Sequence, residues 1–262
     1  MSNAPQVSRS ADESSPPHRP SWQEESRVTS LRTGFRSEAS AYGAGLTALA
    51  AVLPLTYSPA WDGWQRFAKR ALDIAVATIV LLLLAPLLAL IALAIRLDSR
   101  GPIIFRQVRC GKDGRQFVFL KFRGMVAEAE SLQAQLAHRN EADGPIFKIK
   151  DDPRLTRVGR LLRRTSLDEL PQLWNVLRGD MSLVGPRPPV PSEVAQYAPG
   201  QEARLLVPGG ISGLWQVSGR SELSFNDMVR LDIEYIERWS LWLDLSILLR
   251  TAAVVISRRG AY

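Results

Sequence analysis

The sequence predicts a predominantly helical α+β protein that is embedded in a membrane. Its longest apolar run, Ile74–Ile95, extends for 22 residues without a charge. Downstream, two short stretches of strand-like pattern flank a Gly-Lys-Asp-Gly turn at residues 111–114, which is typical of a small β-hairpin. Two later segments carry Arg or Trp among apolar residues at helical spacing, as helices on a membrane surface do.

The composition divides the chain into three parts. Residues 1 to about 40 are polar and rich in Ser and Pro, so they bury too little apolar surface to offset chain entropy. Residues 41–57 are rich in small side chains, which contribute little transfer energy. We therefore expect a disordered or poorly ordered extension at 1–60, a membrane-embedded helix with its lead-in at 61–97, and a folded domain at 98–262.

The apolar run is long enough for a bilayer. A helix over Ile74–Ile95 would be about 33 Å long, against a hydrocarbon core of about 30 Å. A buried helix of a soluble protein is the alternative, but such helices rarely lack a polar face. Trp61 and Trp64 precede the run, where interfacial anchors are expected.

Pro86 lies near the middle of this run and favours a kink, because proline removes one backbone hydrogen bond and clashes with the preceding turn. Basic residues flank both ends of the run, and positive charge prefers the cytoplasmic side of a membrane. These features favour a re-entrant helix with both ends in the cytoplasm. A kinked spanning helix remains the alternative.

The charge distribution points to an anionic partner. The net charge is +7, and between Arg96 and Arg164 basic residues outnumber acidic residues two to one. Nucleic acid, a lipid surface and a phosphate-rich substrate would all suit such a block. Its position directly after the membrane segment favours the last two. The single Cys110 cannot form an internal disulfide, which fits a reducing compartment.

Further helices are expected around the basic block and near the C-terminus. Residues 126–143 are interpreted as a polar helix. The next segment places Arg154, Arg157, Arg160 and Arg164 opposite apolar residues, which fits a basic helix on an anionic membrane or an ordinary surface helix equally well. Residues 231–256, with Trp239 and Trp242, are a second candidate for an interfacial helix.

Two adjacent carboxylates, Asp168 and Glu169, are the strongest candidates for chemistry. Ser166 precedes them at the spacing of a helix capping box, with Glu169 three residues later. Arginines precede the pair, and a Gly-Pro-Arg-Pro stretch follows at residues 185–188. Paired carboxylates beside arginines at a helix start suit phosphate and metal chemistry. A purely structural cap is the alternative.

The same stretch resembles a known signature. Residues 166–188 read SLDELPQLWNVLRGDMSLVGPRP, which is similar to the bacterial sugar transferase family, the small monotopic polyprenyl-phosphate phosphoglycosyl transferases. The resemblance extends from about Phe67 to Tyr262 through the blocks KRALDI, KFRGM, DDPRLTRVGRLLRR, GLWQVSGR and GAY. The final blocks look like the hexose-1-phosphate branch that starts exopolysaccharide repeat units.

The resemblance implies a two-step transfer. Asp168 would attack the sugar-bearing phosphorus of a UDP-sugar and release UMP, and undecaprenyl phosphate would then accept the phosphosugar. Glu169 would bind Mg²⁺. Lys121, Arg163 and Arg187 match basic residues of the family and would contact phosphate.

Three positions depart from the family pattern. The Ser-Pro break of the family's re-entrant helix is Ala85-Pro86 here, without the hydroxyl that would bond a freed carbonyl. Gly124 stands where Thr or Ser is usual. The family's Pro-Gly-Ile-Thr-Gly becomes Pro-Gly-Gly-Ile-Ser-Gly at residues 208–213, with one extra glycine or a shifted proline. This loop is expected to shape the acceptor or sugar pocket, so the choice between glucose and galactose is not read from it.

The sequence therefore predicts an undecaprenyl-phosphate hexose-1-phosphate transferase in the bacterial inner membrane, with its catalytic domain facing the cytoplasm. The expected partners are UDP-sugar, undecaprenyl phosphate and membrane lipids, with no nucleic acid, and the oligomeric state is not predicted. Two alternatives are a lipid diphosphate phosphohydrolase and a membrane-anchored polyanion-binding protein. The two histidines, His18 and His138, lie outside the motif blocks, so a phosphohydrolase would lack a nearby histidine acid.

Overall fold

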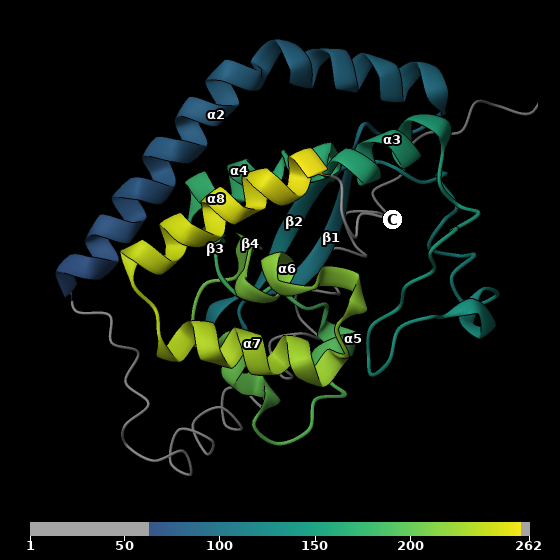
Figure 1. The fold of residues 1–262 in the computed structure, drawn as a ribbon. Coiled ribbons are helices and arrows are strands. Elements are labelled where there is room, and N and C mark those ends of the chain that lie inside the picture. The colour runs from purple at the N-terminus through teal and green to yellow at the C-terminus, as the bar shows by residue number, and fades with distance from the viewer. Residues whose placement is uncertain (1–62, 258–262) are drawn as a thin grey trace, which may run out of the picture. The chain divides into compact units, whose positions relative to one another are not determined.

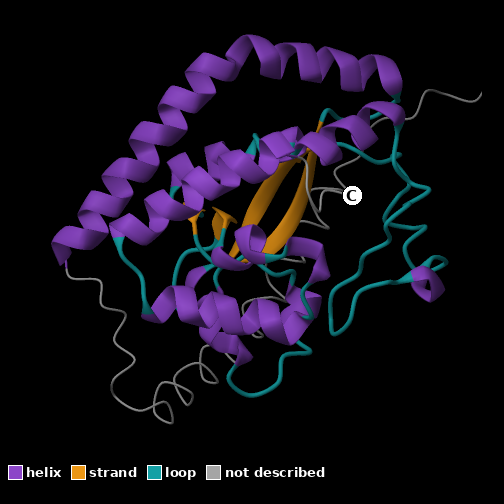
Figure 2. Cartoon of the chain, viewed as in Figure 1, coloured by secondary structure: helices purple, strands orange, loops and turns teal. Residues whose placement is uncertain are grey.

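The computed structural model describes residues 63–257, so the predictions for residues 1–60 and for Trp61 lie outside the described residues. Within that range the chain is predominantly helical, as the sequence predicts, and it contains two small sheets (Figure 2).

Helix α2 (Gly63–Asp98) contains the whole apolar run and its basic flanks. Pro86 lies inside the helix, and α2 bends along its course (Figure 1). Only 11% of its most apolar window is buried. Near the middle, Leu82 is 72% exposed and Leu83 is 71% exposed. A core helix of a soluble protein would hide these side chains, so α2 is compatible with membrane anchoring.

Both ends of α2 are attached to the rest of the domain. Near its start, the Arg70 guanidinium donates to the carbonyls of Val176 and Leu177 at the end of α4 (Gln172–Arg178). Near its end, Ile91 and Ile95 pack in a small core cluster beside Phe122 and Leu162. The last residue, Asp98, accepts a hydrogen bond from the Val158 amide at 3.1 Å. The exposed middle of α2 therefore lies between two anchored ends.

The two stretches around the Gly-Lys-Asp-Gly turn form strands β1 (Ile104–Cys110) and β2 (Gln116–Phe122). They pair antiparallel, with Ile104 opposite Phe122 and Cys110 opposite Gln116. The sequence did not predict the second sheet, in which β3 (Ser182–Val184) pairs parallel with β4 (Gly210–Ser212). Three-residue strands carry too little alternation to be recognised from sequence.

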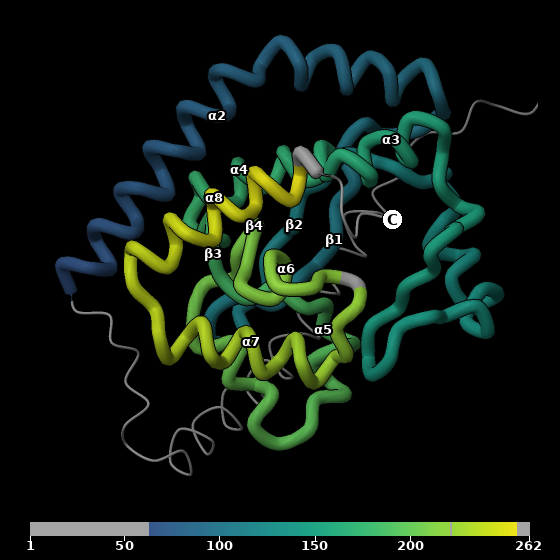
Figure 3. The backbone as a smooth tube through the Cα atoms, in the orientation of Figure 1, coloured from purple at the N-terminus to yellow at the C-terminus, as the bar shows by residue number. Residues whose placement is uncertain are grey.

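The polar helix predicted at residues 126–143 is wrong. This segment is a long irregular stretch of turns that ends in a short 3₁₀ helix, Ala137–Arg139 (Figures 2 and 3). Most of its backbone hydrogen bonds span three residues rather than four. Its side chains are largely exposed, so it lacks the packed apolar face that stabilises most protein helices.

The basic helix forms only in part. Helix α3 (Arg157–Thr165) begins after Thr156, whose hydroxyl accepts a hydrogen bond from the Gly159 amide. Arg154 precedes the helix and is buried, contrary to the predicted exposed arginine face. Its guanidinium pairs with Asp152 and donates to the Ala129 carbonyl.

The capping box predicted at Ser166 is also wrong. Ser166 adopts a left-handed conformation (φ 56°), and its amide closes the end of α3 by donating to the Arg163 carbonyl. A 3₁₀ turn, Leu167–Glu169, follows, and α4 begins only after Pro171. Ser166 therefore ends α3 and directly precedes the 3₁₀ turn, without a hydrogen bond from its side chain to that turn.

The C-terminal region contains two helices, not one. Helices α7 (Phe225–Glu237) and α8 (Leu241–Ser257) are separated by a break at residues 238–240. Trp239 in this break is buried, whereas Trp242 is exposed, so only the second fits an interfacial anchor. The short helices α5 (Pro191–Val194) and α6 (Leu214–Ser218) complete the described fold.

The main core joins α2 to the remainder of the domain. Its buried members come from α2, β2, α4, β3 and the three C-terminal helices, and include Ala77, Phe119, Val176, Leu183, Tyr235 and Ile247. Helix α2 therefore belongs to the same packed unit as the predicted site.

Candidate active site

Asp168 lies on the 3₁₀ turn between α3 and α4 and is almost completely buried, with 4% of its surface exposed. Its carboxylate forms an ion pair with the Lys121 ammonium on β2, with Oδ2 and Nζ 2.6 Å apart. The Lys121 side chain is 32% exposed, so this pair borders solvent. The ion pair holds the carboxylate in one orientation and joins two of the predicted site residues.

Glu169, the next residue, is half-buried. Burial and the neighbouring Asp168 carboxylate raise the pKa of the Glu169 carboxyl group, since both disfavour a second negative charge. Lys121, Arg187 and Arg109 oppose this shift. The acidic pair therefore lies within the electrostatic range of at least three cations.

The turn that carries the pair also contacts helix α2. Leu167 packs against the cluster that contains Ile91 and Ile95 of α2. Because α2 is the apolar helix, the acidic pair lies next to the part of the domain that would meet a bilayer.

Arg187 is exposed, on the loop of residues 185–189 that follows β3. Hydrogen bonds along the backbone hold this loop on both sides. The Gly185 amide donates to Ser212, and the Pro186 carbonyl accepts from Gly210. At the other end, the Pro189 carbonyl accepts from the Cys110 amide. The guanidinium is thus presented by a restrained backbone, which favours anion binding at low entropic cost.

The extra glycine of this region has a packing role. A Cβ atom on Gly210 would lie 2.1 Å from the Gly185 nitrogen, and one on Gly209 would lie 2.4 Å from Pro188 Cγ. Residues 209–210 therefore allow two backbone segments to approach closely. The sequence interpretation that this loop shapes a sugar or acceptor pocket stays a prediction.

Arg163 ends α3 and is half-buried. In the described part of the chain it forms no hydrogen bond or ion pair with Asp168 or Glu169 through its side chain. Its charge instead acts on Lys148. The pKa of the Lys148 ammonium is lowered by burial first, and then by Arg163, Arg187 and Arg220. Lys148 therefore lies within the electrostatic range of these three arginines.

Sequence reasoning missed Lys148 and Arg220. Lys148 lies in an irregular segment that is held together by the Asn140 side chain. The Asn140 amide oxygen accepts a hydrogen bond from the Lys148 amide, and its amide nitrogen donates to the carbonyls of Ala142 and Ile146. No periodic pattern marks such a loop. Arg220 does carry a signal in the structure, a left-handed backbone (φ 51°), which is uncommon outside glycine and clusters at functional sites.

Arg109 was missed as well, because it sits within a strand and looks like an ordinary exposed residue of β1. It is buried, stacks 4.9 Å from the Phe119 ring centroid, and donates to the Pro188 carbonyl at 2.7 Å. Burial and the charge of Arg187 lower the pKa of its guanidinium to about 10, so it is still a cation at neutral pH. Through its hydrogen bond to the Pro188 carbonyl, Arg109 restrains the loop that carries Arg187.

The arrangement suits phosphate chemistry. A buried carboxylate, a second carboxylate and several cations are gathered beside an apolar helix. Mg²⁺ in nucleotide enzymes is commonly held by one or two carboxylates together with substrate phosphates. Asp168 and Glu169 fit that donor set. Among residues 63–257 there is no group of three or more His, Cys, Asp or Glu side chains that would form an all-protein cage.

Comparison with known proteins gives a consistent result. Residues 64–258 match the bacterial sugar transferase family. The chain is 46% identical to galactosyl transferase CpsE of Streptococcus agalactiae, over 79% of this chain and 46% of the relative. It is 43% identical to the UDP-glucose:undecaprenyl-phosphate glucose-1-phosphate transferase of Escherichia coli, over 80% of this chain and 45% of the relative.

A shorter relative matches over most of its length. The exopolysaccharide production protein ExoY of Rhizobium meliloti is 39% identical over 74% of this chain and 88% of its own length. By contrast, the chain spans less than half the length of the CpsE and Escherichia coli relatives. The family match covers well over half of the chain and includes α2, the acidic pair and the Arg187 loop. The chain belongs to the bacterial sugar transferase family.

Proposed function

We propose that this chain transfers hexose-1-phosphate from a UDP-sugar to undecaprenyl phosphate, and so starts the synthesis of an exopolysaccharide or another glycan repeat unit. The observation that carries the proposal is the acidic pair, which lies among cations beside the membrane helix. A site at this position can meet a water-soluble nucleotide sugar on one side and a lipid phosphate on the other. The Escherichia coli relative is named as a UDP-glucose:undecaprenyl-phosphate glucose-1-phosphate transferase, a transfer of this class.

The first step uses Asp168 as the nucleophile. A carboxylate oxygen attacks the sugar-bearing phosphorus, the bond to the bridging oxygen of the diphosphate breaks, and UMP departs. The product is a phosphosugar on the Asp168 carboxylate. The contact of 2.6 Å with Lys121 supports this role because it fixes the carboxylate, and because the half-exposed ammonium is available to a phosphate oxygen.

The second step regenerates the enzyme. A phosphate oxygen of undecaprenyl phosphate attacks the same phosphorus, the Asp168 carboxylate leaves, and the sugar ends on an undecaprenyl diphosphate. Arg187 has an exposed guanidinium without an ion-pair partner in residues 63–257, and its planar fork suits phosphate oxygens. Arg163, Lys148 and Arg220 would add positive charge on the same side. Mg²⁺ held by Glu169 would neutralise diphosphate charge.

We further propose that α2 enters the membrane and returns, so that both of its ends face the cytoplasm. Arg70 near its start and Asp98 at its end both bind the same domain, while Leu82 and Leu83 between them are exposed. A helix that crossed the bilayer would separate these two ends by about 30 Å of hydrocarbon. Pro86 accounts for the bend without a neighbouring serine.

The activity is tested with the full chain in isolated membranes, supplied with UDP-glucose or UDP-galactose, Mg²⁺ and undecaprenyl phosphate. We expect release of UMP together with formation of a lipid-linked sugar. Release of UMP without lipid-linked sugar would instead identify a phosphohydrolase. Absence of UMP release with every UDP-sugar would contradict both, and favour a protein that only binds polyanions.

The metal role predicts a specific response to Glu169→Gln. Removing one of the two carboxylates should raise the Mg²⁺ concentration for half-maximal activity by at least about 10-fold, because Mg²⁺ in such sites has few protein ligands. The measurement is a Mg²⁺ titration of UMP release after treatment with EDTA. Glu234→Gln on α7, which removes only an exposed pair with Arg238, serves as the control. An unchanged titration for Glu169→Gln would remove Glu169 from the metal site.

The topology predicts which cysteines label from each side. In a Cys110→Ser background, which removes the buried natural thiol, Arg66→Cys and Arg100→Cys place thiols at exposed positions near the two ends of α2. Both should react with a membrane-impermeant maleimide only in inside-out vesicles, and Leu83→Cys in neither orientation. Labelling of the two end positions from opposite sides would mean that α2 spans the membrane.

A further inference from the structure

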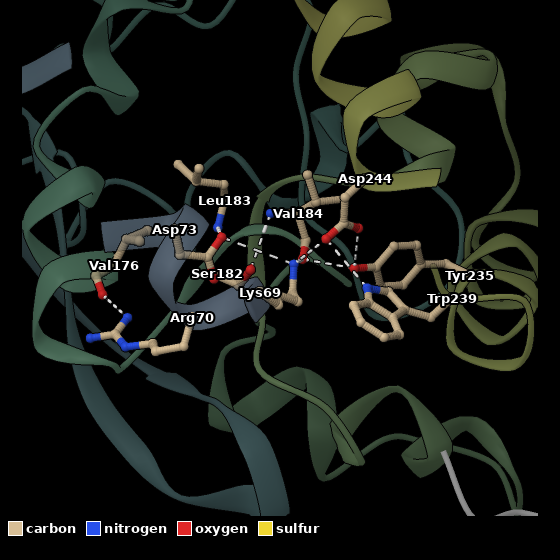
Figure 4. Close-up of polar contacts among 10 residues, drawn as sticks. All are labelled: Lys69, Arg70, Asp73, Val176, Ser182, Leu183, Val184, Tyr235, Trp239 and Asp244. Carbon is tan, nitrogen blue, oxygen red and sulfur yellow. Dashed lines mark hydrogen bonds and ion pairs between the residues drawn. The ribbon is translucent and has the colours of Figure 1, made fainter. Parts of the chain in front are cut away.

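A buried polar cluster joins the start of α2 to strand β3 and to helix α8. We call it the Lys69 cluster, and it comprises Lys69, Asp73, Tyr235, Trp239 and Asp244. All five residues are buried, and Lys69 is only 3% exposed. Figure 4 shows the Lys69 ammonium among the Asp244 carboxylate, the Tyr235 hydroxyl and the carbonyl of Val184.

The cluster binds both a carboxylate and the backbone of β3. Lys69 Nζ lies 2.5 Å from Asp244 Oδ2 and donates to the Val184 carbonyl at 3.2 Å. The Tyr235 hydroxyl lies 3.0 Å from the same carbonyl and 2.8 Å from Asp244 Oδ1. The Trp239 indole N–H donates to Asp244 at 3.3 Å. Asp244 thus orients the Lys69 ammonium and the Tyr235 hydroxyl, and both of these groups contact the Val184 carbonyl.

A second contact from the membrane helix holds the preceding residue of β3. The Asp73 carboxylate accepts a hydrogen bond from the Leu183 amide at 3.2 Å. Side chains of α2 therefore satisfy backbone groups of two consecutive residues, on a strand whose other neighbour is β4. Because this sheet has only two short strands, these side chains satisfy the Val184 carbonyl and the Leu183 amide, which would otherwise need a third strand.

Strand β3 leads directly into the loop of Arg187. Val184 is three residues before Arg187, and the residues between them are fixed by the hydrogen bonds of Gly185 and Pro186 to the β4 segment. The Arg109 contact with Pro188 restrains the far side. Because these contacts restrain the backbone on both sides of Arg187, a displacement of Val184 would be transmitted to Arg187.

We propose that Lys69 and Tyr235 are positioning residues for Arg187, so that the docking of the membrane helix sets the geometry of the phosphate-binding loop. This inference rests on the proposed function, in which Arg187 contacts substrate phosphate. Core stability alone does not require the buried Lys69–Asp244 ion pair, since packed apolar residues of the same volume stabilise a core as well or better. Its polar groups instead fix β3 at one position.

The test replaces both members of the Lys69–Asp244 pair and leaves Asp73, whose Oδ1 lies 4.0 Å from Lys69 Nζ, hydrogen-bonded to the Leu183 amide. In the full chain in membranes, Lys69→Met/Asp244→Asn should lower kcat/KM for the UDP-sugar by about 100-fold, the effect of a misplacement of about 1 Å in a binding group. Tyr235→Phe, which removes one hydroxyl and keeps the ring, should lower it by about 10-fold through the same path. If the double variant fails to fold, Tyr235→Phe carries the test.

Arg204→Met/Asp232→Asn is the matched control. It removes another buried ion pair, which lies beside Tyr197 and makes no hydrogen bond to β3 or to residues 185–189 in the described chain. A control variant that remains folded and membrane-bound should keep the wild-type KM for the UDP-sugar. A control that lowers kcat/KM as much as the Lys69 variant would show a general effect of core polarity and overturn the proposal.

A combination with Arg187→Met separates positioning from general stability. If Lys69 acts through Arg187, then adding Lys69→Met/Asp244→Asn to Arg187→Met causes no further loss, because coupled residues are not additive. Losses that multiply, or a folded Lys69 variant with wild-type kinetics, would overturn the inference. Failure of the proposed function is distinct, because the unmodified chain would then form no lipid-linked sugar.

Discussion

Asp168→Asn is expected to abolish the transfer of sugar phosphate, with a loss of at least about 1,000-fold in turnover, the scale seen when a covalent nucleophile is removed. Asparagine has nearly the same shape, but its amide cannot form the acyl phosphate that the first step requires. The loss should appear in kcat more than in KM, because the cations that surround the site remain. UMP release is the direct measurement.

Two further measurements make this prediction specific. Radiolabelled UDP-sugar, given without undecaprenyl phosphate, should label the unmodified chain covalently and leave Asp168→Asn unlabelled. Asp113→Asn is the control, since Asp113 is an exposed residue in the β1–β2 turn with φ 57°, a conformation that asparagine also tolerates. Full turnover by Asp168→Asn would show that another group is the nucleophile.

Gly159→Ala is expected to destabilise the domain more than a glycine-to-alanine substitution at an exposed position. A Cβ atom at this position would lie 1.8 Å from the Gly124 carbonyl oxygen and 2.4 Å from its carbon. Backbone cannot move aside as a flexible side chain does, so α3 would be pushed away from the end of β2. We expect the free energy of unfolding to fall by about 3 kcal/mol.

The displacement should also reach the site, because α3 carries Arg163 and ends at Ser166, two residues before Asp168. Urea unfolding in nanodiscs measures the stability, and UMP release measures the activity. Gly63→Ala, at the exposed start of α2 with no atom near the added Cβ, should stay within about 0.5 kcal/mol of the unmodified chain. Equal stability of the two variants would contradict the close approach at Gly159.

Some departures from the family pattern have physical reasons that only the structure supplies. At Gly124, where Thr or Ser is usual in relatives, an added Cβ would lie 3.4 Å from the Gly159 Cα, which is ordinary van der Waals contact, whereas an added Cβ on Gly159 would clash with the Gly124 backbone. Two glycines face each other at this crossing. Gly209 and Gly210 have such a reason, since they allow the Arg187 loop to pack on the β4 segment, while the pocket role of their loop stays a prediction.

The sequence alone determined the features that depend on local composition and periodicity. An uncharged run of 22 residues is long enough for a bilayer whatever surrounds it, and alternation around a Gly-Lys-Asp-Gly turn predicts paired strands without further context. The family blocks around Asp168 also needed only the order of residues. Two predictions that relied on weak local patterns, the capping box at Ser166 and the polar helix at residues 126–143, were wrong. Tertiary packing overrides such weak local preferences.

Only the tertiary structure decided which distant residues meet. Lys121 and Asp168 are 47 positions apart, and no periodicity brings them within 2.6 Å. Lys148, Arg109 and Arg220 join the site from a loop, a strand and a turn that look ordinary in sequence. Both ends of α2 bind one domain for the same reason, because Lys69 pairs with Asp244 and Ile95 packs in one cluster with Leu162, residues that are distant in the sequence. Long-range packing therefore brings the predicted motif together with basic residues from distant segments, beside helix α2.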